Sequence, residues 1–173
     1  MLKIDIRYIY KRGADMDKRE TTCCFIGHRQ IAETEKLRAA LKTTIESLIV
    51  NEKVDTFLCG SKSRFNDLCL ELITEIKKSH PHVKRVYVRA EYPIISEEYE
   101  KYLLKCYEET YFPQKLAGAG RSVYVQRNIE MIKESGFCIV YLLEGERYAT
   151  RKSGTKIAAE YASRQGCRII KFP

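Results

Sequence analysis

The segment Ser153-Gly154-Thr155 is the clearest candidate in this sequence for binding a charged ligand. It follows an apolar run at residues 137–143, which predicts a buried strand, and a polar loop, and a helical pattern begins at its end. A helix N-terminus presents N–H groups without intrahelical partners and about half a positive charge. Glycine lets an anion approach the backbone, and threonine adds a hydroxyl donor. The sequence therefore predicts a phosphate site at these three residues.

Three other segments follow predicted strands and bring polar groups to the same edge of a sheet. They are Gly27-His28-Arg29, Gly60-Ser61-Lys62-Ser63-Arg64 and Ala90-Glu91-Tyr92-Pro93. Ligands of open parallel sheets bind outside the carboxyl ends of the strands, so we expect these segments to surround one site. The glycines and cations of the first two suit a ligand that carries phosphate. The alternative is that Gly60 only makes a tight turn while Lys62 and Arg64 are solvated.

His28 could act as a general base or hydrogen-bond a ligand. A lone histidine without a carboxylate or cysteine partner visible nearby is more often structural, so catalysis is the less favoured role. His80 and His82 have no spacing that would complete a metal site, and no Walker, dinucleotide-binding or nucleophile-elbow motif occurs. We therefore expect neither a metal nor a cofactor.

Arg127 lies in a predicted helix at residues 122–135. In this helix the expected buried stripe consists of Val125, Ile129 and Ile132. A different face, roughly opposite the stripe, is then shared by Tyr124, Arg127 and Met131. A methionine on the surface beside an arginine would be unusual, so we expect this face to contact a ligand or a second subunit. An ordinary solvated arginine is the alternative.

The elements that must position these residues alternate regularly from residue 21 onward. Strands are predicted at residues 22–26, 56–59, 84–89, 137–143 and 168–172, with a brief extended piece at 111–113. Helices are predicted at residues 33–50, 65–78, 96–107, 122–135 and 155–165. This alternation indicates βαβ units and a mainly parallel sheet covered on both faces. The fold class is therefore α/β, a three-layer α/β/α Rossmann-like sandwich.

Composition limits the class of protein. The chain has 173 residues and 45% hydrophobic residues, which fits one folded domain, and no apolar run approaches the ~20 residues that span a membrane. Seven cysteines without a Cys-x-x-Cys pair predict neither a disulfide framework nor a zinc site, which favours a cytoplasmic protein. The net charge is +8, but the lysines and arginines are interspersed with glutamates along the predicted helices. This pattern favours solvated helix faces over nucleic-acid binding.

The first twenty residues differ from the remainder. Residues 11–20 are almost wholly polar and predict a linker, which gives a single domain at residues 21–173. Met16 lies just before the first strand, so residues 1–15 are either an extension from an upstream start or, through residues 2–10, an edge strand. The charges at the N-terminus argue against a signal peptide.

With these segments placed, the chain resembles the SLOG superfamily, which joins the DprA/Smf proteins to the LOG phosphoribohydrolases. It looks most like the small YpsA-like bacterial members. The matching segments are residues 23–29 (CCFIGHR), residues 58–60 with Phe65, residues 119–128 (AGRSVYVQRN) leading to Met131, and residues 137–143 with Ser153-Gly154-Thr155. The resemblance covers about residues 21–173. It implies a nucleotide or nucleotide-derived ligand at the strand ends, with Arg127 and Asn128 among the ligand-binding residues, and a homodimer.

The LOG enzymes cleave the base from a nucleoside monophosphate. They use an arginine before a methionine, matched by Arg127 and Met131, and a Pro-Gly-Gly-x-Gly-Thr-x-x-Glu motif. Gly154 and Thr155 match the Gly-Thr step of that motif. Its Pro-Gly-Gly lead is replaced here by residues 148–153 (YATRKS).

Ala158 stands where the enzyme motif has its glutamate. Glu160 lies two positions later, about 200° around the helix, and cannot simply substitute. Without a placed carboxylate, glycosidic cleavage lacks its acid/base group. We therefore expect a binding or sensor domain. The alternatives are a phosphoribohydrolase with Glu91 or Glu160 recruited as the carboxylate, and single-stranded DNA binding like that of DprA.

Overall fold

A computed structural model of the chain describes residues 17–143 and 153–173. It contains a six-stranded sheet in the order β4-β3-β2-β1-β5-β6, and every pairing is parallel. The strands are β1 (Thr22–Gly27), β2 (Thr56–Cys59), β3 (Lys84–Val88), β4 (Glu109–Tyr111), β5 (Phe137–Tyr141) and β6 (Arg168–Phe172). The prediction of a parallel α/β fold is confirmed.

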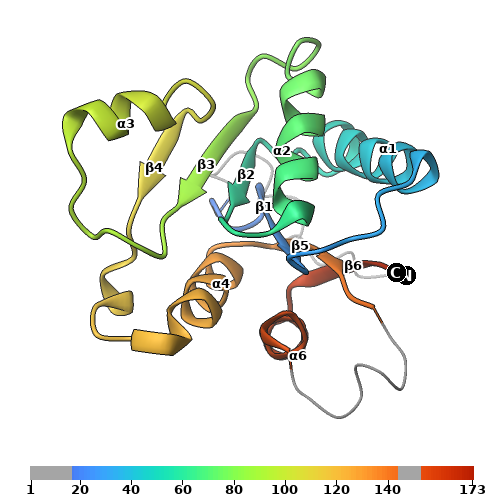
Figure 1. Cartoon of the computed structure of the whole chain (residues 1–173). Coiled ribbons are helices and arrows are strands. Elements are labelled where there is room, and N and C mark those ends of the chain that lie inside the picture. The colour runs from blue at the N-terminus through green and yellow to red at the C-terminus, as the bar shows by residue number, and fades with distance from the viewer. Residues whose placement is uncertain (1–16, 144–152) are drawn as a thin grey trace, which may run out of the picture.

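Helices cover both faces of the sheet. They are α1 (Glu35–Asn51), α2 (Arg64–Ile76), α3 (Glu97–Leu103), α4 (Val123–Lys133) and α6 (Gly154–Arg164), with short 3₁₀ turns η3 (Gln114–Leu116) and η4 (Gly120–Ser122). Figure 1 shows α1 and α2 on one side of the sheet, α4 and α6 on the other, and α3 beside β4. The three-layer sandwich is therefore confirmed. No helix in the described ranges is both long enough and apolar enough to cross a membrane.

The central strand β1 is buried on both faces, which explains its unbroken run of apolar residues. Cys23 and Phe25 pack into the core cluster under α1 and α2, whereas Cys24 and Ile26 pack under α4 and α6. This assignment to opposite clusters follows from the two-residue period of a strand. The two cores hold the sheet between its helical layers.

The strand order places a topological switch point beside β1. The chain leaves β1 toward β2, β3 and β4 on one side, and it returns to β5 and β6 on the other side. At the carboxyl end of the two strands, Gly27 of β1 is paired with Tyr141 of β5. Ligands of open α/β sheets bind in the crevice at such a point.

Serine and threonine caps set where several helices begin. In each case the cap's side chain accepts a hydrogen bond from a backbone N–H of the first turn; the caps are Thr34 for α1, Ser63 for α2, Ser96 for α3 and Ser153 for α6. The predicted Ser96 cap is confirmed. Because Thr34 is its cap, α1 begins at Glu35 rather than at the predicted residue 33. Separately, α3 ends at Leu103 rather than at the predicted residue 107. The extended piece predicted at 111–113 is β4, two residues earlier.

Residues 17–20, the end of the predicted linker, form a turn against the domain. The Arg19 side chain donates hydrogen bonds to the carbonyl oxygens of Ser135 and Gln165, at 3.1 and 2.7 Å. The Arg19 carbonyl accepts the N–H of Gly136 at 2.6 Å. The alternatives considered for residues 1–15, and the segment 148–152, lie outside the described residues.

Candidate functional site

A cavity of about 900 Å³ opens at the carboxyl ends of the strands, beside the switch point. Every ligand-binding residue predicted from the sequence except Gly60 lines it: Gly27, His28, Arg29, Ser61, Arg127, Asn128, Ser153, Gly154 and Thr155. The structure therefore brings together segments that are far apart in the chain. Sequence reasoning missed several further lining residues, namely Gln30, Asn66, Arg121, Val125 and Leu143.

The start of α6 forms one wall of the cavity. Ser153 caps the helix: its Oγ accepts the N–H of Lys156 at 3.2 Å, and its carbonyl accepts the N–H of Ile157 at 3.0 Å. The N–H groups of Gly154 and Thr155 have no partner within the helix, as expected for its first turn. Two backbone donors and the positive end of the helix dipole are thus available at the position predicted for phosphate.

The start of α2 forms a second wall with the same polarity. Its cap, Ser63, lines the cavity, and the Ser63 hydroxyl lies 3.2 and 3.0 Å from the carbonyl oxygens of Gly27 and His28. The first turn of α2 carries Asn66, whose Oδ1 accepts the N–H of Gly60 at 2.8 Å. Two helix N-termini therefore border one cavity, which favours an anionic occupant.

Arg127 is buried in the wall of the cavity, with only 3% of its surface exposed. Its Nε donates to Oδ1 of Asn128 at 3.0 Å, and one terminal nitrogen lies 3.4 Å from the carbonyl of Val88 and 3.5 Å from Oγ of Ser61. Within residues 17–143 and 153–173 it forms no ion pair with a carboxylate. Burial lowers the pKa of Arg127 to about 10, so the guanidinium remains charged at neutral pH.

The prediction for the faces of this helix was wrong in part, since of the expected stripe only Ile132 is buried. The buried residues of α4 are Arg127, Met131 and Ile132, whereas Val125 and Ile129 of the expected stripe are only half-buried. Met131 is fully buried in the core under α4 and α6. Apolar periodicity assumes that charged side chains point to water, and the buried arginine breaks that assumption. Arg127 and Met131 therefore lie inside the domain and give no support for a subunit surface, and the homodimer stays a prediction from the resemblance.

Two of the predicted glycines leave room for a neighbouring side chain. A Cβ on Gly60 would lie 2.4 Å from Cζ of Arg127, and one on Gly27 would lie 2.3 Å from the ring of Phe65. Both distances are far shorter than a van der Waals contact. Gly60 therefore makes room for the buried arginine, which explains why it lies behind the cavity wall rather than lining it.

His28 ties three parts of the site together. Its Nε2 accepts the N–H of Leu143 at 3.3 Å, and its Nδ1 lies 3.5 Å from Oγ1 of Thr155. Burial lowers the pKa of His28, so the ring is neutral at pH 7, and accepting at Nε2 places its hydrogen on Nδ1. The ring thus links the ends of β1 and β5 to the first turn of α6. This geometry fits the structural role better than the catalytic one.

The cavity wall is basic. Its cations are Arg29, Lys62, Arg121 and Arg127, and no aspartate or glutamate among the described residues lines it. Of the two glutamates considered for catalysis, Glu91 accepts a hydrogen bond from Lys62 just outside the lining, and Glu160 lies on α6 and is not among the described lining residues. The described part of the wall therefore suits a ligand with several negative charges.

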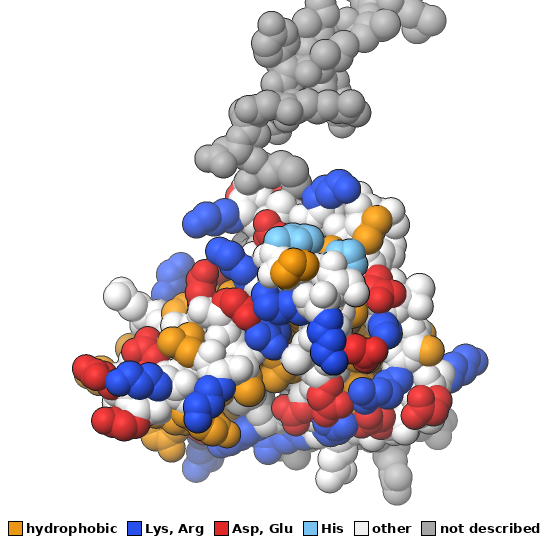
Figure 2. Space-filling model, turned by 90° about the horizontal axis from the view of Figure 1, so that it is seen from above, with side chains coloured by type: hydrophobic (Ala, Val, Ile, Leu, Met, Phe, Trp, Pro, Cys, Tyr) orange, Lys and Arg blue, Asp and Glu red, His pale blue; other side chains and the backbone are white. Residues whose placement is uncertain are grey.

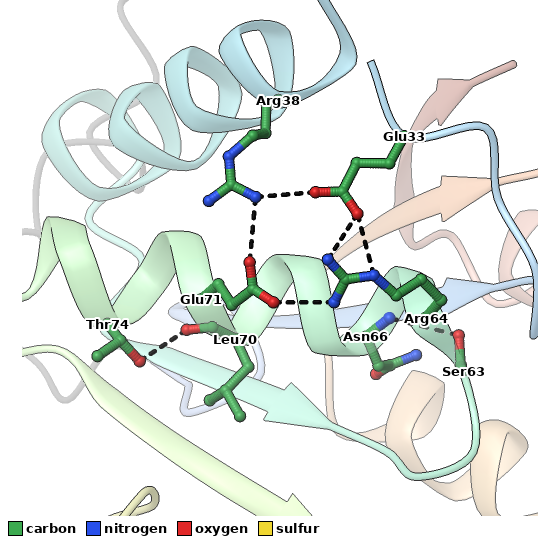
Figure 3. Close-up of polar contacts among 8 residues, drawn as sticks. All are labelled: Glu33, Arg38, Ser63, Arg64, Asn66, Leu70, Glu71 and Thr74. Atoms are coloured by element: carbon green, nitrogen blue, oxygen red, sulfur yellow. Dashed lines mark hydrogen bonds and ion pairs between the residues drawn. The ribbon is translucent and has the colours of Figure 1, made fainter. Parts of the chain in front are cut away.

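Arg64, expected as a possible cation of this rim, points elsewhere. Figure 3 shows it in a closed ring of ion pairs with Glu33, Arg38 and Glu71. Arg64 donates to Glu71 at 2.8 Å and to Glu33 at 3.0 Å, and Arg38 donates to Glu71 at 3.0 Å and to Glu33 at 2.9 Å. The charge of Arg64 is compensated within this ring, so it adds nothing to the cavity.

The sequence matches no model of a known protein family, and a search among curated proteins also gives no match.

Proposed function

We propose that this protein is a binding or sensor domain for a nucleotide or a nucleotide-derived small molecule. A phosphate of the ligand lies at the first turn of α6, where Ser153, Gly154 and Thr155 supply backbone and hydroxyl donors. Arg127 supplies positive charge from the buried wall, and the rest of the ligand extends along the ends of β1 and β2. This assignment agrees with the function that a SLOG-like resemblance implies.

The observation that carries the proposal is the buried guanidinium of Arg127. Burying a charge without a partner is unfavourable, and the lowered pKa of Arg127 reflects that cost. Its hydrogen bonds go to neutral oxygens, two of them at 3.4 and 3.5 Å. An anionic ligand in the cavity would supply the missing counter-charge to this buried group.

Ala158 favours binding over hydrolysis. It is fully buried and packs in the core under α4 and α6, so its position on α6 faces the sheet. A carboxylate is required beside the glycosidic bond for cleavage, and none of the described lining residues carries one. We therefore assign recognition, not cleavage, to this site.

Calorimetric titration with AMP, GMP, CMP and UMP tests the proposal, with adenosine as the matched ligand without phosphate. We expect at least one monophosphate to bind and adenosine not to bind. Arg127→Met should weaken that binding by roughly ten- to a hundredfold, because a charge-assisted hydrogen bond is lost. Arg164→Met, the same change at the exposed end of α6, should leave it unaltered. Absence of binding by all four monophosphates would contradict the proposal.

The hydrolase alternative makes a different prediction. It requires free base in excess of the protein concentration after incubation with the same four monophosphates. Under the proposed function, the monophosphates are recovered intact. Chromatographic quantification of the base separates the two.

The DNA-binding alternative needs a continuous basic surface. Figure 2 instead shows lysines and arginines mixed with aspartates and glutamates over the face that it draws. Binding of single-stranded DNA would also fall steeply with salt, because phosphate contacts release counterions. We expect weak binding even at low salt, measured by fluorescence anisotropy of a labelled oligonucleotide.

A further inference from the structure

Glu91, in the loop after β3, is held by two residues of the cavity wall. Its Oε1 accepts a hydrogen bond from Nζ of Lys62 at 2.6 Å and a short one from the hydroxyl of Tyr124. Lys62 belongs to the loop after β2, and Tyr124 belongs to the first turn of α4. One carboxylate oxygen thus connects the loop after β3 to the loop after β2 and to the first turn of α4, at the edge of the cavity. Two hydrogen-bond donors point to the same anionic atom there.

Tyr124 lies among more cations than anions. Nζ of Lys62 is 5.1 Å from the centre of its ring, and the guanidinium carbons of Arg29 and Arg127 are each 5.9 Å from it. Arg29 and Arg127 form no ion pair with any carboxylate of the described residues. Glu91, paired with Lys62, is therefore the one carboxylate of that part of the chain that pairs with a cation around the Tyr124 ring. The cluster therefore has the charge to hold a stronger anion than one carboxylate.

The contact with Glu91 is one that a ligand could replace. The side chains of Lys62 and Glu91 are 53% and 39% exposed, and ion pairs at that exposure contribute little to stability. Lys62 and Tyr92, the residue after Glu91, both have positive φ angles, of 56° and 57°. Non-glycine residues in this conformation are uncommon and concentrate at binding sites.

We propose that Lys62 and Tyr124 form a second anion subsite, which Glu91 occupies in this structure and yields to a second phosphoryl group of the ligand. The proposal rests on the proposed function, in which the start of α6 and Arg127 hold the first phosphate. The start of α4 connects the two subsites, because Val125, next to Tyr124, packs at 3.1 Å from where a Cβ of Gly154 would lie.

The ligand class then narrows to nucleotides with at least two phosphoryl groups, such as a nucleoside diphosphate or a molecule with a pyrophosphate bridge. The phosphoryl oxygens accept the hydrogen bonds of Lys62 and Tyr124 that Glu91 accepts here. Glu91 turns to solvent, where a carboxylate is well hydrated. Its role is that of a competitor, which lowers the affinity for the second phosphoryl group and leaves binding of the first unchanged.

Calorimetric titration of wild type and Glu91→Gln with ADP and AMP tests this directly. We expect Glu91→Gln to bind ADP roughly two- to tenfold more tightly, because the competing charge is gone, and to bind AMP within about twofold of wild type. Glu97→Gln is the matched control, since Glu97 is an exposed glutamate on α3 outside the cavity lining. It should change neither affinity. An unchanged or weaker affinity of Glu91→Gln for ADP would overturn the subsite.

Pyrophosphate and orthophosphate, titrated in the same way, remove base recognition from the test. Tighter pyrophosphate binding by Glu91→Gln, without binding of any nucleotide, supports the subsite and contradicts the proposed function. Binding of AMP, with no effect of Glu91→Gln on the affinity for ADP or pyrophosphate, supports the proposed function and contradicts the subsite. Failure of pyrophosphate to bind either protein also overturns the subsite.

Tyr124→Phe, added to Glu91→Gln, tests the hydroxyl donor separately. It keeps the ring and the cations around it, so we expect the fold, measured by circular dichroism and thermal melting, to be retained. Pyrophosphate affinity should return toward the wild-type value. An affinity equal to that of the single Glu91→Gln variant would exclude Tyr124 from the subsite.

Discussion

Arg127 shows how one side chain can work against stability. A buried guanidinium needs several hydrogen bonds to offset the loss of water, and Arg127 has one at 3.0 Å and two weaker ones at 3.4 and 3.5 Å. The fall in its pKa to about 10 corresponds to an unfavourable burial on the order of 3 kcal/mol. That cost is present at neutral pH, where the group is charged in both the folded and the unfolded states.

Arg127→Met should therefore have opposite effects on stability and on binding. Methionine is of similar length and packs well in apolar surroundings, so we expect the free energy of unfolding to rise by about 1–3 kcal/mol. Urea denaturation without ligand, compared with Arg164→Met, measures this change. A loss of stability would show that the hydrogen bonds to Asn128, Ser61 and Val88 outweigh the cost of burial.

The residues of the site could be found from the sequence because strand ends of a parallel sheet converge. Gly27-His28-Arg29 and Ser153-Gly154-Thr155 were identified as polar segments after strands, and both line the cavity. Lining residues such as Gln30 and Leu143 carry no comparable signal, since their types are common anywhere. The structural role of Gly60 could also not be predicted from the sequence. Glycine is needed there because of a close contact with Arg127, which lies on a helix far away in the sequence.

At the level of elements, the four-residue ring joins the two helices on one face of the sheet. Arg38 lies on α1, Arg64 and Glu71 lie on α2, and Glu33 precedes α1 (Figure 3). Each carboxylate is shared by two arginines, so a closed network replaces isolated pairs. Such networks are stronger than single exposed pairs and fix the relative position of the helices that they join.

Glu71→Gln should lower the melting temperature by about 1–3 °C at low salt, and less at 0.5 M NaCl. The hydrogen bond from Arg64, with a further one from Arg38, lowers the pKa of Glu71. The contribution is therefore complete above the ordinary carboxyl value of 4.5 and is lost as pH falls through the lower folded value. The difference between variant and wild type should then shrink below about pH 4. A difference independent of both salt and pH would mean that the ring is not electrostatic in effect.

The order of elements was predictable because apolar strands and amphipathic helices alternate with clear turn signals. The largest difference in limits is found where the pattern is weak: α3 ends at Leu103 rather than at residue 107 and buries only Leu103, and β4 has only three residues. The orientation of α4 was not predictable in the same way. The inward face of α4 contacts a polar cavity at one end of the helix and the apolar core at the other end. The spacing of apolar residues can predict only the contact with the core.

For the molecule as a whole, the exposure of the cysteine thiols shows how well the two cores are shielded from solvent. All seven cysteines are free, and all except Cys106 are buried. Burial raises the pKa of Cys59 to about 12 and raises the pKa of the Cys69 thiol well above its ordinary value, so neither is reactive at neutral pH.

Titration of the native protein with Ellman's reagent should therefore release about one thiol equivalent rapidly, and seven after denaturation. Cys106→Ser should abolish the rapid phase without changing the melting temperature, because its side chain packs in neither core. Rapid reaction of any thiol in the native Cys106→Ser variant would indicate that a core opens under these conditions.

The contact between Gly60 and Arg127 also has a consequence for how this protein can evolve. Because a single methyl group at position 60 would lie 2.4 Å from the guanidinium, position 60 cannot change while Arg127 keeps this place. In a lineage that abandons the ligand, Arg127 would be replaced first, and only then would alanine or serine become acceptable at position 60. Among homologous sequences we expect arginine at position 127 to occur only with glycine at position 60, so that a larger residue at position 60 identifies relatives that no longer bind.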